Sequence, residues 1–415
     1  MKKLFIILSI CLCSLAQAKS PVVKTGIEVL RDRGFEGLVG RKVGLVTNPS
    51  GVDSNLNSTV DILYNAPGVE LVALYGPEHG VRGDVYAGDK VNDSVDAATG
   101  LPVFSIYGAT RKPTQEMLEG VEVMVYDIQD VGVRSYTFIS SLGLVMEACA
   151  EKGIEVMVLD RPNPLGGHKI EGCYVEPGFF SFVSQYPIPY VYGLTVGELA
   201  VMINEENMNR GQKGDQNPAH CKLTIVPMEG WTRDMVYEDT CLPWVLPSPN
   251  IPFKDSPMYY ASSGVCGELY GFLNIGVGYT LPFQVFGALW LEPEALKAKL
   301  ESYDVPGVDF RTIWYKPFSG SLKGQLVKGL QFFFTDYEKA RLTEVQFMVM
   351  QAINEIYPDK RAFEMVSGIG LFDKVCGTDY IRLEFMKDYR FDSIKEYWRK
   401  DESAFRELSQ KYYMY

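Results

Sequence analysis

Short apolar runs alternate with helix-like segments through the first two-thirds of the chain. Apolar runs of this length, bounded by glycine, proline and polar residues, are typical of strands buried on both faces. Between them lie helix patterns, and one of these begins after Thr195, with Glu198 in the capping-box position. The predicted strands are 42–47, 69–75, 102–107, 121–126 and 154–159, and the predicted helices are 25–33, 58–64, 138–152 and 196–204, with another starting at Thr114.

Strands that alternate with helices predict a mostly parallel sheet covered by helices on both faces. The expected fold class is therefore α/β, with a Rossmann-like architecture. From about Leu291 the pattern changes to two aromatic strands, 309–315 and 329–335, followed by helices at 342–357 and 394–412. The chain is too long for one typical core. We expect a Rossmann-like domain over residues 19–285 and a smaller C-terminal α+β domain over residues 286–415.

The first eighteen residues have the features of an export signal peptide. Lys2 and Lys3 form a positive start, residues 4–15 an apolar middle, and Ala16-Gln17-Ala18 a small-residue cleavage site. No later run is long enough to span a bilayer. These features predict an exported, periplasmic protein without stable membrane insertion.

The charge of the chain argues against a nucleic-acid-binding protein, and its cysteine spacing argues against a cysteine metal site. Without the two signal lysines, 38 basic residues stand against 52 acidic ones, a formal charge of −14. Such an acidic protein is a poor candidate for binding nucleic acid. Six cysteines follow the signal without a paired metal-binding spacing. We expect buried thiols for most of them, and we favour Cys221 with Cys241 for one disulfide.

Four of the predicted strands end in polar loops that are rich in glycine or proline. The carboxyl ends of parallel strands meet at one edge of a sheet, where open α/β sheets bind ligands, so these loops are expected to form one cleft. Turn formation alone also explains such residues, since aspartate caps helices and asparagine makes turns. The candidate residues are Asn48 in the first loop, Glu78, His79 and Arg82 in the second, Asp127, Gln129, Asp130 and Arg134 in the third, and Asp160, Arg161 and Asn163 in the fourth.

The side chains of this expected cleft are carboxylates, arginines and amides with one histidine. The sequence has neither a Gly-x-Gly-x-x-Gly nucleotide loop nor a Gly-x-Ser-x-Gly nucleophile motif, and we expect no metal or organic cofactor. Carboxylates suit glycoside hydrolysis, in which one acid assists the leaving oxygen while a second acid or the substrate's acetamido group acts on the other face. We predict Glu78 as the acid and Asp127 and Asp160 as further catalytic carboxylates, while His79 orients a neighbouring group, binds a hydroxyl or is structural.

Long motifs extend in order through nearly the whole mature chain, at 46–51, 75–84, 99–105, 111–114, 127–132, 160–164, 195–200 and 247–250. In these motifs the chain resembles the exo-β-N-acetylmuramidases of glycoside hydrolase family 171. The resemblance implies a Rossmann-like catalytic domain, a smaller C-terminal domain and a cleft between them. It also implies release of N-acetylmuramic acid from non-reducing ends of peptidoglycan fragments, with the catalytic glutamate at Glu78. Asn250, in the last motif, joins the substrate-binding candidates.

N-acetylmuramic acid carries a lactyl carboxylate, which requires a cation in the binding site. A guanidinium that donates two hydrogen bonds suits a carboxylate best. The candidates for this contact are Arg82, Arg134 and Arg161.

One segment departs from the family's pattern. Where the family commonly has a Ser-Glu-Gly-Arg-Gly-Thr-like stretch before Pro-Phe, this chain has 274–280, with Ile275 and Val277 in place of the charged pair. Branched apolar residues favour an apolar contact. The loop either borders the cleft, where it would change specificity, or packs between the two domains.

Two rival functions remain compatible with the sequence. One is a non-catalytic periplasmic binder of cell-wall sugars, which the change at Ile275 and Val277 would suit. The other is a metal-dependent hydrolase with Asp127, Asp130 and Asp160 as ligands.

Overall fold

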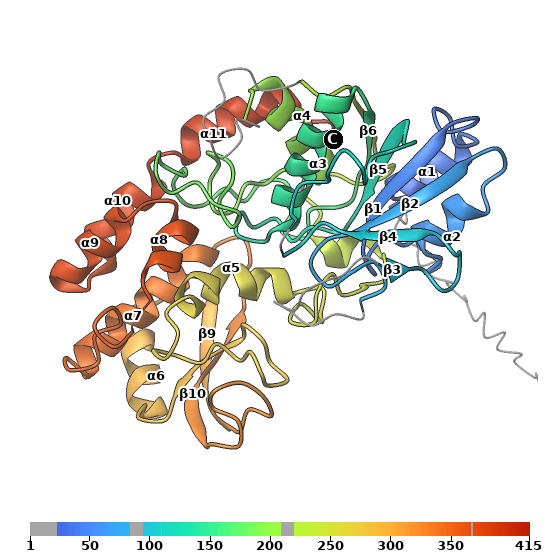
Figure 1. Ribbon diagram of the computed structural model, residues 1–415. Helices are drawn as coiled ribbons and strands as arrows, with labels where there is room; N and C mark the ends of the chain where they lie inside the picture. The colour runs from blue at the N-terminus through green and yellow to red at the C-terminus, as the bar shows by residue number, and fades with distance from the viewer. Residues whose placement is uncertain (1–22, 84–93, 109, 209–219, 367) are drawn as a thin grey trace, which may run out of the picture.

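Residues 23–83, 94–108, 110–208, 220–366 and 368–415 are described by the computed structural model of the protein (Figure 1). The predicted export signal, residues 1–18, lies outside these ranges, as does Asp84 at the end of the Glu78 loop. In the part of the chain that is described, no helix is long and apolar enough to cross a membrane.

A sheet that is parallel except at one edge forms the first domain. In the described ranges its strand order is β3-β4-β2-β1-β5-β6-β7, and only the pairing of β3 with β4 is antiparallel. The carboxyl ends of β1, β2, β5 and β6 therefore lie at one edge, as predicted. The strands are β1 (Lys42–Thr47), β2 (Glu70–Gly76), β3 (Ser94–Val95), β4 (Pro102–Ser105), β5 (Val123–Asp127), β6 (Glu155–Leu159) and β7 (Leu223–Val226).

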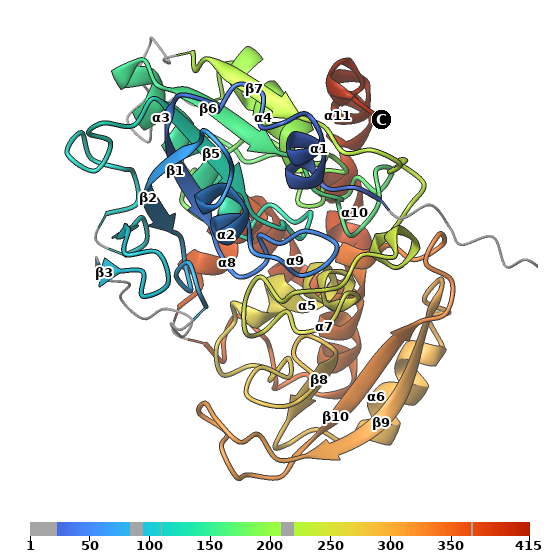
Figure 2. The ribbon, with the colours of Figure 1, turned by 90° about the vertical axis from the view of Figure 1, so that its right-hand side faces the viewer.

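Helices cover both faces of this sheet, which confirms the α/β prediction. Helices α1 (Gly26–Asp32) and α2 (Thr59–Tyr64) lie on one face, and α3 (Phe138–Lys152) and α4 (Val196–Glu205) lie on the other (Figures 1 and 2). In β5 alternate side chains enter the two cores: Val123 and Val125 face one, while Met124 and Tyr126 face the other. This alternation explains why the central strands are apolar throughout.

The predicted capping box of α4 is present, whereas the helix predicted from Thr114 is wrong. Thr195 and Glu198 exchange hydrogen bonds at the start of α4, with N–O distances of 3.0 and 3.2 Å. Residues 115–120 instead form turns that end at Gly120, whose φ of +75° is left-handed. A helix cannot continue through a left-handed residue, so the segment leads directly into β5.

The C-terminal part combines a small antiparallel sheet, in the order β8-β10-β9, with helices. The predicted strands correspond to β9 and β10, but the helix predicted over 394–412 is divided, because α10 ends before Asp401 and α11 follows it. The elements are α5 (Ser256–Gly267), β8 (Val285–Ala288), α6 (Pro293–Glu301), β9 (Val308–Tyr315), β10 (Val327–Phe334), α7 (Val345–Ile356), α8 (Gly370–Cys376), α9 (Tyr380–Asp388), α10 (Phe391–Arg399) and α11 (Glu402–Ser409).

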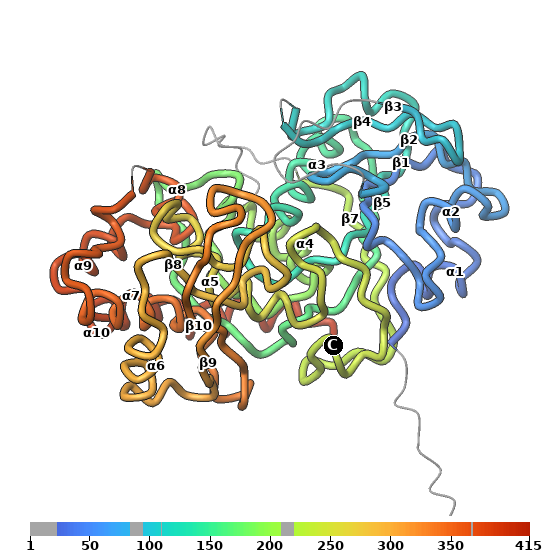
Figure 3. The backbone as a smooth tube through the Cα atoms, turned by 90° about the horizontal axis from the view of Figure 1, so that it is seen from below, coloured from blue at the N-terminus to red at the C-terminus, as the bar shows by residue number. Residues whose placement is uncertain are grey.

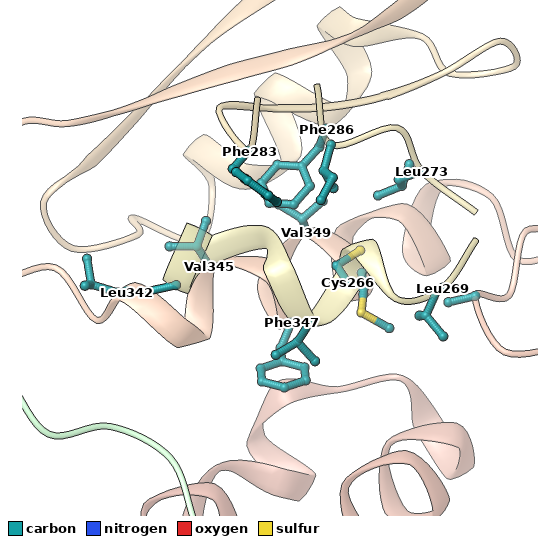
Figure 4. Close-up of a cluster of buried hydrophobic side chains, with 14 of the residues drawn as sticks. Cys266, Leu269, Leu273, Phe283, Phe286, Leu342, Val345, Phe347 and Val349 are labelled. Carbon is teal, nitrogen blue, oxygen red and sulfur yellow. The ribbon is translucent and has the colours of Figure 1, made fainter. Parts of the chain in front are cut away.

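Helix α5, which precedes the predicted domain boundary at residue 285, packs into the C-terminal core. Cys266 and Leu269, at its end, share a hydrophobic cluster with Phe286 of β8 and with Phe347 and Val349 of α7 (Figure 4).

The two domains are joined by buried polar contacts. The Arg134 guanidinium donates to the carbonyl of Cys173 and, from the C-terminal domain, to those of Val375 and Cys376, with N–O distances of 2.8 to 2.9 Å. The chain then returns to the first domain (Figure 3), where the Tyr415 hydroxyl donates to Asp160 at 2.8 Å. These contacts fix the C-terminal domain at the sheet.

The disulfide predicted between Cys221 and Cys241 is wrong. Both cysteines are free thiols. Cys221 is buried in the core beside α3 and α4, whereas Cys241 is exposed at the end of a short 3₁₀ helix, Tyr237–Thr240. The spacing in the sequence gave no information on this difference in burial.

Candidate active site

Glu78 is held at the edge of the sheet by two hydroxyl groups from different elements. Its carboxyl is half-buried in the loop after β2. The Tyr107 hydroxyl, from the loop after β4, donates to one oxygen at 2.9 Å, and the Thr137 hydroxyl, before α3, donates to the other at 3.3 Å. A hydroxyl both donates and accepts, so the same partners hold a carboxylate or a carboxylic acid. Glu78 thus combines fixed geometry with access to solvent.

The backbone beside Glu78 is strained in a way that functional loops often are. His79 has a φ of +75°, in the left-handed region that non-glycine residues rarely adopt, and Gly80 follows at +74°. A residue stays in such a strained conformation only where the surrounding contacts hold it there. The turn leaves Glu78 half-buried while the side chain of His79 is buried. This burial favours the structural role for His79 over the predicted contact with a hydroxyl.

Asp127 forms a buried ion pair instead of facing the cleft. Arg161 donates to both of its oxygens, at 2.5 and 3.0 Å, and the Thr59 hydroxyl donates to one of them. Arg161 also donates to the carbonyl of Val52 at 2.7 Å, which fixes the loop after β1. Asp127 and Arg161 are both buried. These contacts favour a structural role for the pair over the predicted roles in catalysis and substrate binding.

Asp160 caps α4 and is completely buried. One oxygen accepts from the Gly197 backbone amide at 2.8 Å, and the other accepts from the Thr195 and Tyr415 hydroxyls at 2.7 and 2.8 Å. An aspartate at a helix N-terminus satisfies backbone amides that otherwise have no partner. Burial raises the pKa of Asp160 to about 6. The contacts again favour a structural role over the predicted catalytic one.

Asp130 is buried, but only one of its two carboxyl oxygens accepts hydrogen bonds from described residues. One oxygen accepts from the Gly132 amide at 2.7 Å and from the Tyr192 hydroxyl, while the other has no partner in the described ranges. Burial raises the pKa of Asp130 to about 6. Burial raises the pKa of Tyr136, a hydrogen bond with Ser248 lowers it, and the charges of Asp130 and Glu78 raise it further.

The predicted amide residues hold the loops together. Asn48 donates to the carbonyl of Pro247 at 3.1 Å, and Asn163 donates to that of Leu194 at 2.9 Å. Gln129 donates to the carbonyl of Pro162 at 2.8 Å. All three amides are buried and connect the strand-end loops, while the side-chain oxygen of Gln129 has no partner among the described residues.

The other two predicted arginines, Arg82 and Arg134, also form hydrogen bonds with protein groups. Arg82 donates to both oxygens of Asp96, at 2.9 and 3.0 Å, and this contact is the main reason that the pKa of Asp96 falls to about 2. The fully buried Arg134 bonds to backbone carbonyls of both domains. Together with Arg161, all three guanidinium groups proposed for the lactyl carboxylate already have protein partners.

Arg111 is a cation near Glu78 that the sequence reasoning missed. Its exposed guanidinium lies 4.3 Å from the centre of the Phe182 ring. Burial and then the charge of Glu78 raise the pKa of Tyr107, and the positive charge of Arg111 opposes them. The Phe182 ring lies 6.3 Å from the Tyr107 ring, which places Arg111 near the phenol that contacts Glu78, and Arg111 has no ion-pair partner in the part of the chain that is described.

Of the predicted residues, the structure brings only some to one place. Glu78 contacts the Tyr107 and Thr137 hydroxyls, the buried His79 follows Glu78 directly in the chain, and the charges of Glu78 and Asp130 both act on the Tyr136 phenol. Asn250 instead lines a separate pocket in the C-terminal part. Among the residues that are described, no group of three or more His, Cys, Asp or Glu side chains could hold a metal ion.

Comparison with known proteins identifies the family. Residues 43–255 match the N-terminal domain of the exo-β-N-acetylmuramidase NamZ, and residues 258–415 match its C-terminal domain. This chain belongs to the NamZ exo-β-N-acetylmuramidase family. The two matched regions meet at the start of α5, the helix that packs into the C-terminal core.

Relatives of the NamZ family match almost the whole chain. It is 42% identical over 398 residues to the peptidoglycan β-N-acetylmuramidase NamZ of Bacillus subtilis (strain 168), covering 96% of this chain and 92% of that protein. Two crystal structures of DUF1343 family proteins from Bacteroides fragilis also match. One has 51% identity and a TM-score of 0.89, the other 26% and 0.72, and each match covers 95% of this chain and 99% of the other.

Proposed function

We propose that this protein is an exo-acting glycoside hydrolase that releases N-acetylmuramic acid from non-reducing ends of peptidoglycan fragments. The observation that carries the proposal is Glu78, a half-buried carboxyl held by two hydroxyls at the edge of the sheet, in a chain of the NamZ family. The export signal expected in residues 1–18 supports action in the periplasm, where peptidoglycan is found.

We propose Glu78 for the acid step, and its two hydroxyl contacts at the edge of the sheet support this proposal. Protonated Glu78 gives its proton to the glycosidic oxygen as the bond from that oxygen to C1 breaks, and the electron pair leaves with the second sugar. Water then adds to C1 and loses a proton, which restores the acid. Tyr107 and Thr137 are positioning residues, because they fix the direction of the carboxyl.

The second group of the reaction is best supplied by the substrate. Asp127, Asp130 and Asp160 are all buried, and the carboxylates of Asp127 and Asp160 have their oxygens occupied by protein donors. The acetamido oxygen of N-acetylmuramic acid can instead attack C1 from the face opposite Glu78.

The lactyl carboxylate would be bound by Arg111. It is exposed and lies near the phenol that contacts Glu78, whereas the three arginines predicted for this role bond to protein groups. A charge-assisted hydrogen bond to a carboxylate is stronger than a neutral one.

The decisive experiment is an assay for free N-acetylmuramic acid released from a muramyl-glucosamine disaccharide. Wild-type protein should release it, and Glu78→Gln should lower turnover by ~10²–10⁴-fold while leaving the fold unchanged. Fragments with a glucosamine at the non-reducing end should not be cut. A protein that binds the disaccharide without cleaving it would be a binder, and activity lost after treatment with a chelator would indicate a metal-dependent hydrolase.

A further inference from the structure

A second pocket lies in the C-terminal part of the molecule, beside the end of α5. Its volume is about 520 Å³, within the range of ligand sites in proteins. Behind it is a packed cluster to which Cys266, Leu269 and Leu273 contribute from the end of α5 and the loop that follows, with Phe283 and Phe286 before and within β8 (Figure 4). The pocket is therefore built on a rigid wall.

The pocket contains a carboxyl group without a hydrogen-bond partner. One oxygen of Glu268 is buried and unpartnered among the residues described. Burial raises the pKa of Glu268 to about 7. The described residues that line the pocket include no lysine, arginine or histidine. A buried carboxyl of this kind is costly unless a ligand or water satisfies it.

The rest of the lining suits a sugar. Tyr270 is 73% exposed, and the charge of Glu268 is the main cause of its raised pKa, so the phenol and the carboxyl lie close together. Trp290 and Leu289 supply an apolar wall, and Asn250 an amide. Apolar faces with a few polar groups at fixed positions are typical of sites that bind small molecules.

The departure from the family pattern lies in this pocket. Both residues line the pocket, but Ile275 is 8% exposed and also packs in the core, whereas Val277 is 38% exposed. The loop therefore borders this pocket through both residues, and Ile275 also packs in the hydrophobic core. The family's charged pair is absent, so Glu268 is the ionisable acid that remains in the lining, with the phenols of Tyr260 and Tyr270.

One aromatic contact separates this pocket from Glu78. Tyr260 lines the pocket, and its ring lies 5.7 Å from that of Tyr136. Tyr136 directly precedes Thr137, whose hydroxyl donates to Glu78. The Tyr260 hydroxyl also shares a hydrogen bond of 2.9 Å with Ser135. The segment 135–137 thus connects the pocket wall to the acid.

We propose that this pocket binds the N-acetylhexosamine leaving group, with Glu268 accepting a hydrogen bond from its acetamido N–H or a hydroxyl. Tyr270 would contact the pyranose face, and Val277 and Leu289 the acetamido methyl group. The proposal rests on the function proposed above, since it places the sugar beyond the scissile bond. Without a cation the pocket does not suit the lactyl carboxylate, which agrees with the assignment of that group to Arg111.

Two substrates with different leaving groups test the proposal. Glu268→Leu, which removes both side-chain oxygens, and Tyr270→Ala should raise KM for the muramyl-glucosamine disaccharide by roughly tenfold, as expected for the loss of one hydrogen bond to a carboxyl or one ring contact. Hydrolysis of para-nitrophenyl β-N-acetylmuraminide, whose leaving group has no acetamido group, should stay at the wild-type rate. Tyr64→Ala, an exposed tyrosine on α2, serves as the control.

Equal losses on both substrates, or no loss on either, would overturn the assignment. If wild-type protein cleaves neither substrate, the proposed function fails, and the pocket is then tested by calorimetric titration with free N-acetylglucosamine. Binding that is lost in Glu268→Leu would support the pocket independently of catalysis. Equal binding by wild type and both variants, or none by wild type, would reject it.

Discussion

The loops after β2 and β5 carry similar residues but use them differently. Each places an acid in a polar turn at the carboxyl end of a core strand. Glu78, after β2, is half-buried and contacts two neutral hydroxyls. Asp127, at the end of β5, is fully buried and receives two hydrogen bonds from Arg161. The partners and the exposure of a carboxyl, more than its place in the topology, distinguish a group that can react from one that holds the fold.

The largest expected effect concerns the ion pair of Asp127. Asp127→Ala should lower the free energy of unfolding by about 3–5 kcal/mol, because it leaves the Arg161 guanidinium buried without its partner. Glu78→Gln should leave the unfolding midpoint nearly unchanged and affect turnover alone. Urea unfolding of both variants, with disaccharide hydrolysis by the folded fraction, measures the contrast.

A matched control for Asp127→Ala is the double variant with Arg161→Met. Removing both charges should recover part of the stability, because no unpaired charge remains in the core. If Asp127→Ala were stable and inactive, Asp127 would be catalytic and the comparison of the two loops would be reversed.

The next effect is a pH dependence that arises from Asp130. Burial raises its pKa from 3.8 to about 6. The folded state therefore binds this proton more tightly than the unfolded chain, so the contribution to stability is complete below pH 3.8 and is lost as the pH rises through 6. The loss should be on the order of 3 kcal/mol.

Asp130→Asn removes this titration while an oxygen remains to accept from Tyr192. The unfolding free energy of the variant, minus that of the wild type, should rise between pH 4 and pH 6.5 and be constant above it. Chemical denaturation at a series of pH values gives both curves. A difference that does not change with pH would mean that Asp130 ionises in the folded protein as readily as in the unfolded chain.

A smaller effect is expected at Arg111. Arg111→Gln should raise KM for the muramyl disaccharide by roughly 10–100-fold, since a hydrogen bond to a charged group contributes about 1.5–3 kcal/mol. Arg111→Lys should recover part of this, because it keeps the charge and loses the bidentate geometry. A substrate with the lactyl carboxylate converted to an amide should respond much less to the substitution. If Arg111→Gln changed KM equally for the carboxylate and the amide substrate, Arg111 would not bind the lactyl carboxylate.

The elements of the first domain were predictable because the apolar residues of a buried strand are visible in its own sequence. The apolar runs and the capping box at Thr195 depend on neighbours in the chain, and β1, β2, β5, β6 and α4 appear where they were predicted. Strands β3, β7 and β8 and helices α5, α6, α8 and α9 were missed. The formation of β7 depends on contacts with a segment far away in the sequence, since it pairs with β6.

The candidate site was less predictable. Whether a polar side chain can contact a ligand depends on which protein groups it already bonds to, and these groups lie far away in the sequence. Arg82, Arg134 and Arg161 look equivalent in the sequence, yet one pairs with an aspartate of a later loop, one with backbone carbonyls of both domains and one with Asp127. Tyr107 lay within a predicted strand and was not considered. The motif 111–114 contained Arg111, and its place in a polar segment after a strand was the signal that could have drawn attention to it.

The smallest effect, and the sharpest test of the pocket, is expected for Val277→Arg. The turn around Val277 is set by Gly276 and Gly278, both with φ of +88°, and by a 3.2 Å hydrogen bond from Asn274 to the Val277 carbonyl. The side chain is partly exposed, so the unfolding free energy should change by no more than about 0.5 kcal/mol.

The new guanidinium would share the pocket with Glu268 and hold it as a carboxylate, in competition with the leaving sugar. A partly exposed ion pair contributes about 0.2–1 kcal/mol, so KM for the disaccharide should rise roughly two- to fivefold, with no change for the para-nitrophenyl substrate. Val277→Leu, which adds volume without charge, is the matched control. A lower KM for the disaccharide would mean that this position faces the muramic acid carboxylate, and the leaving group would then bind elsewhere. A loss of stability without a kinetic change would mean that Val277, like Ile275, serves packing alone.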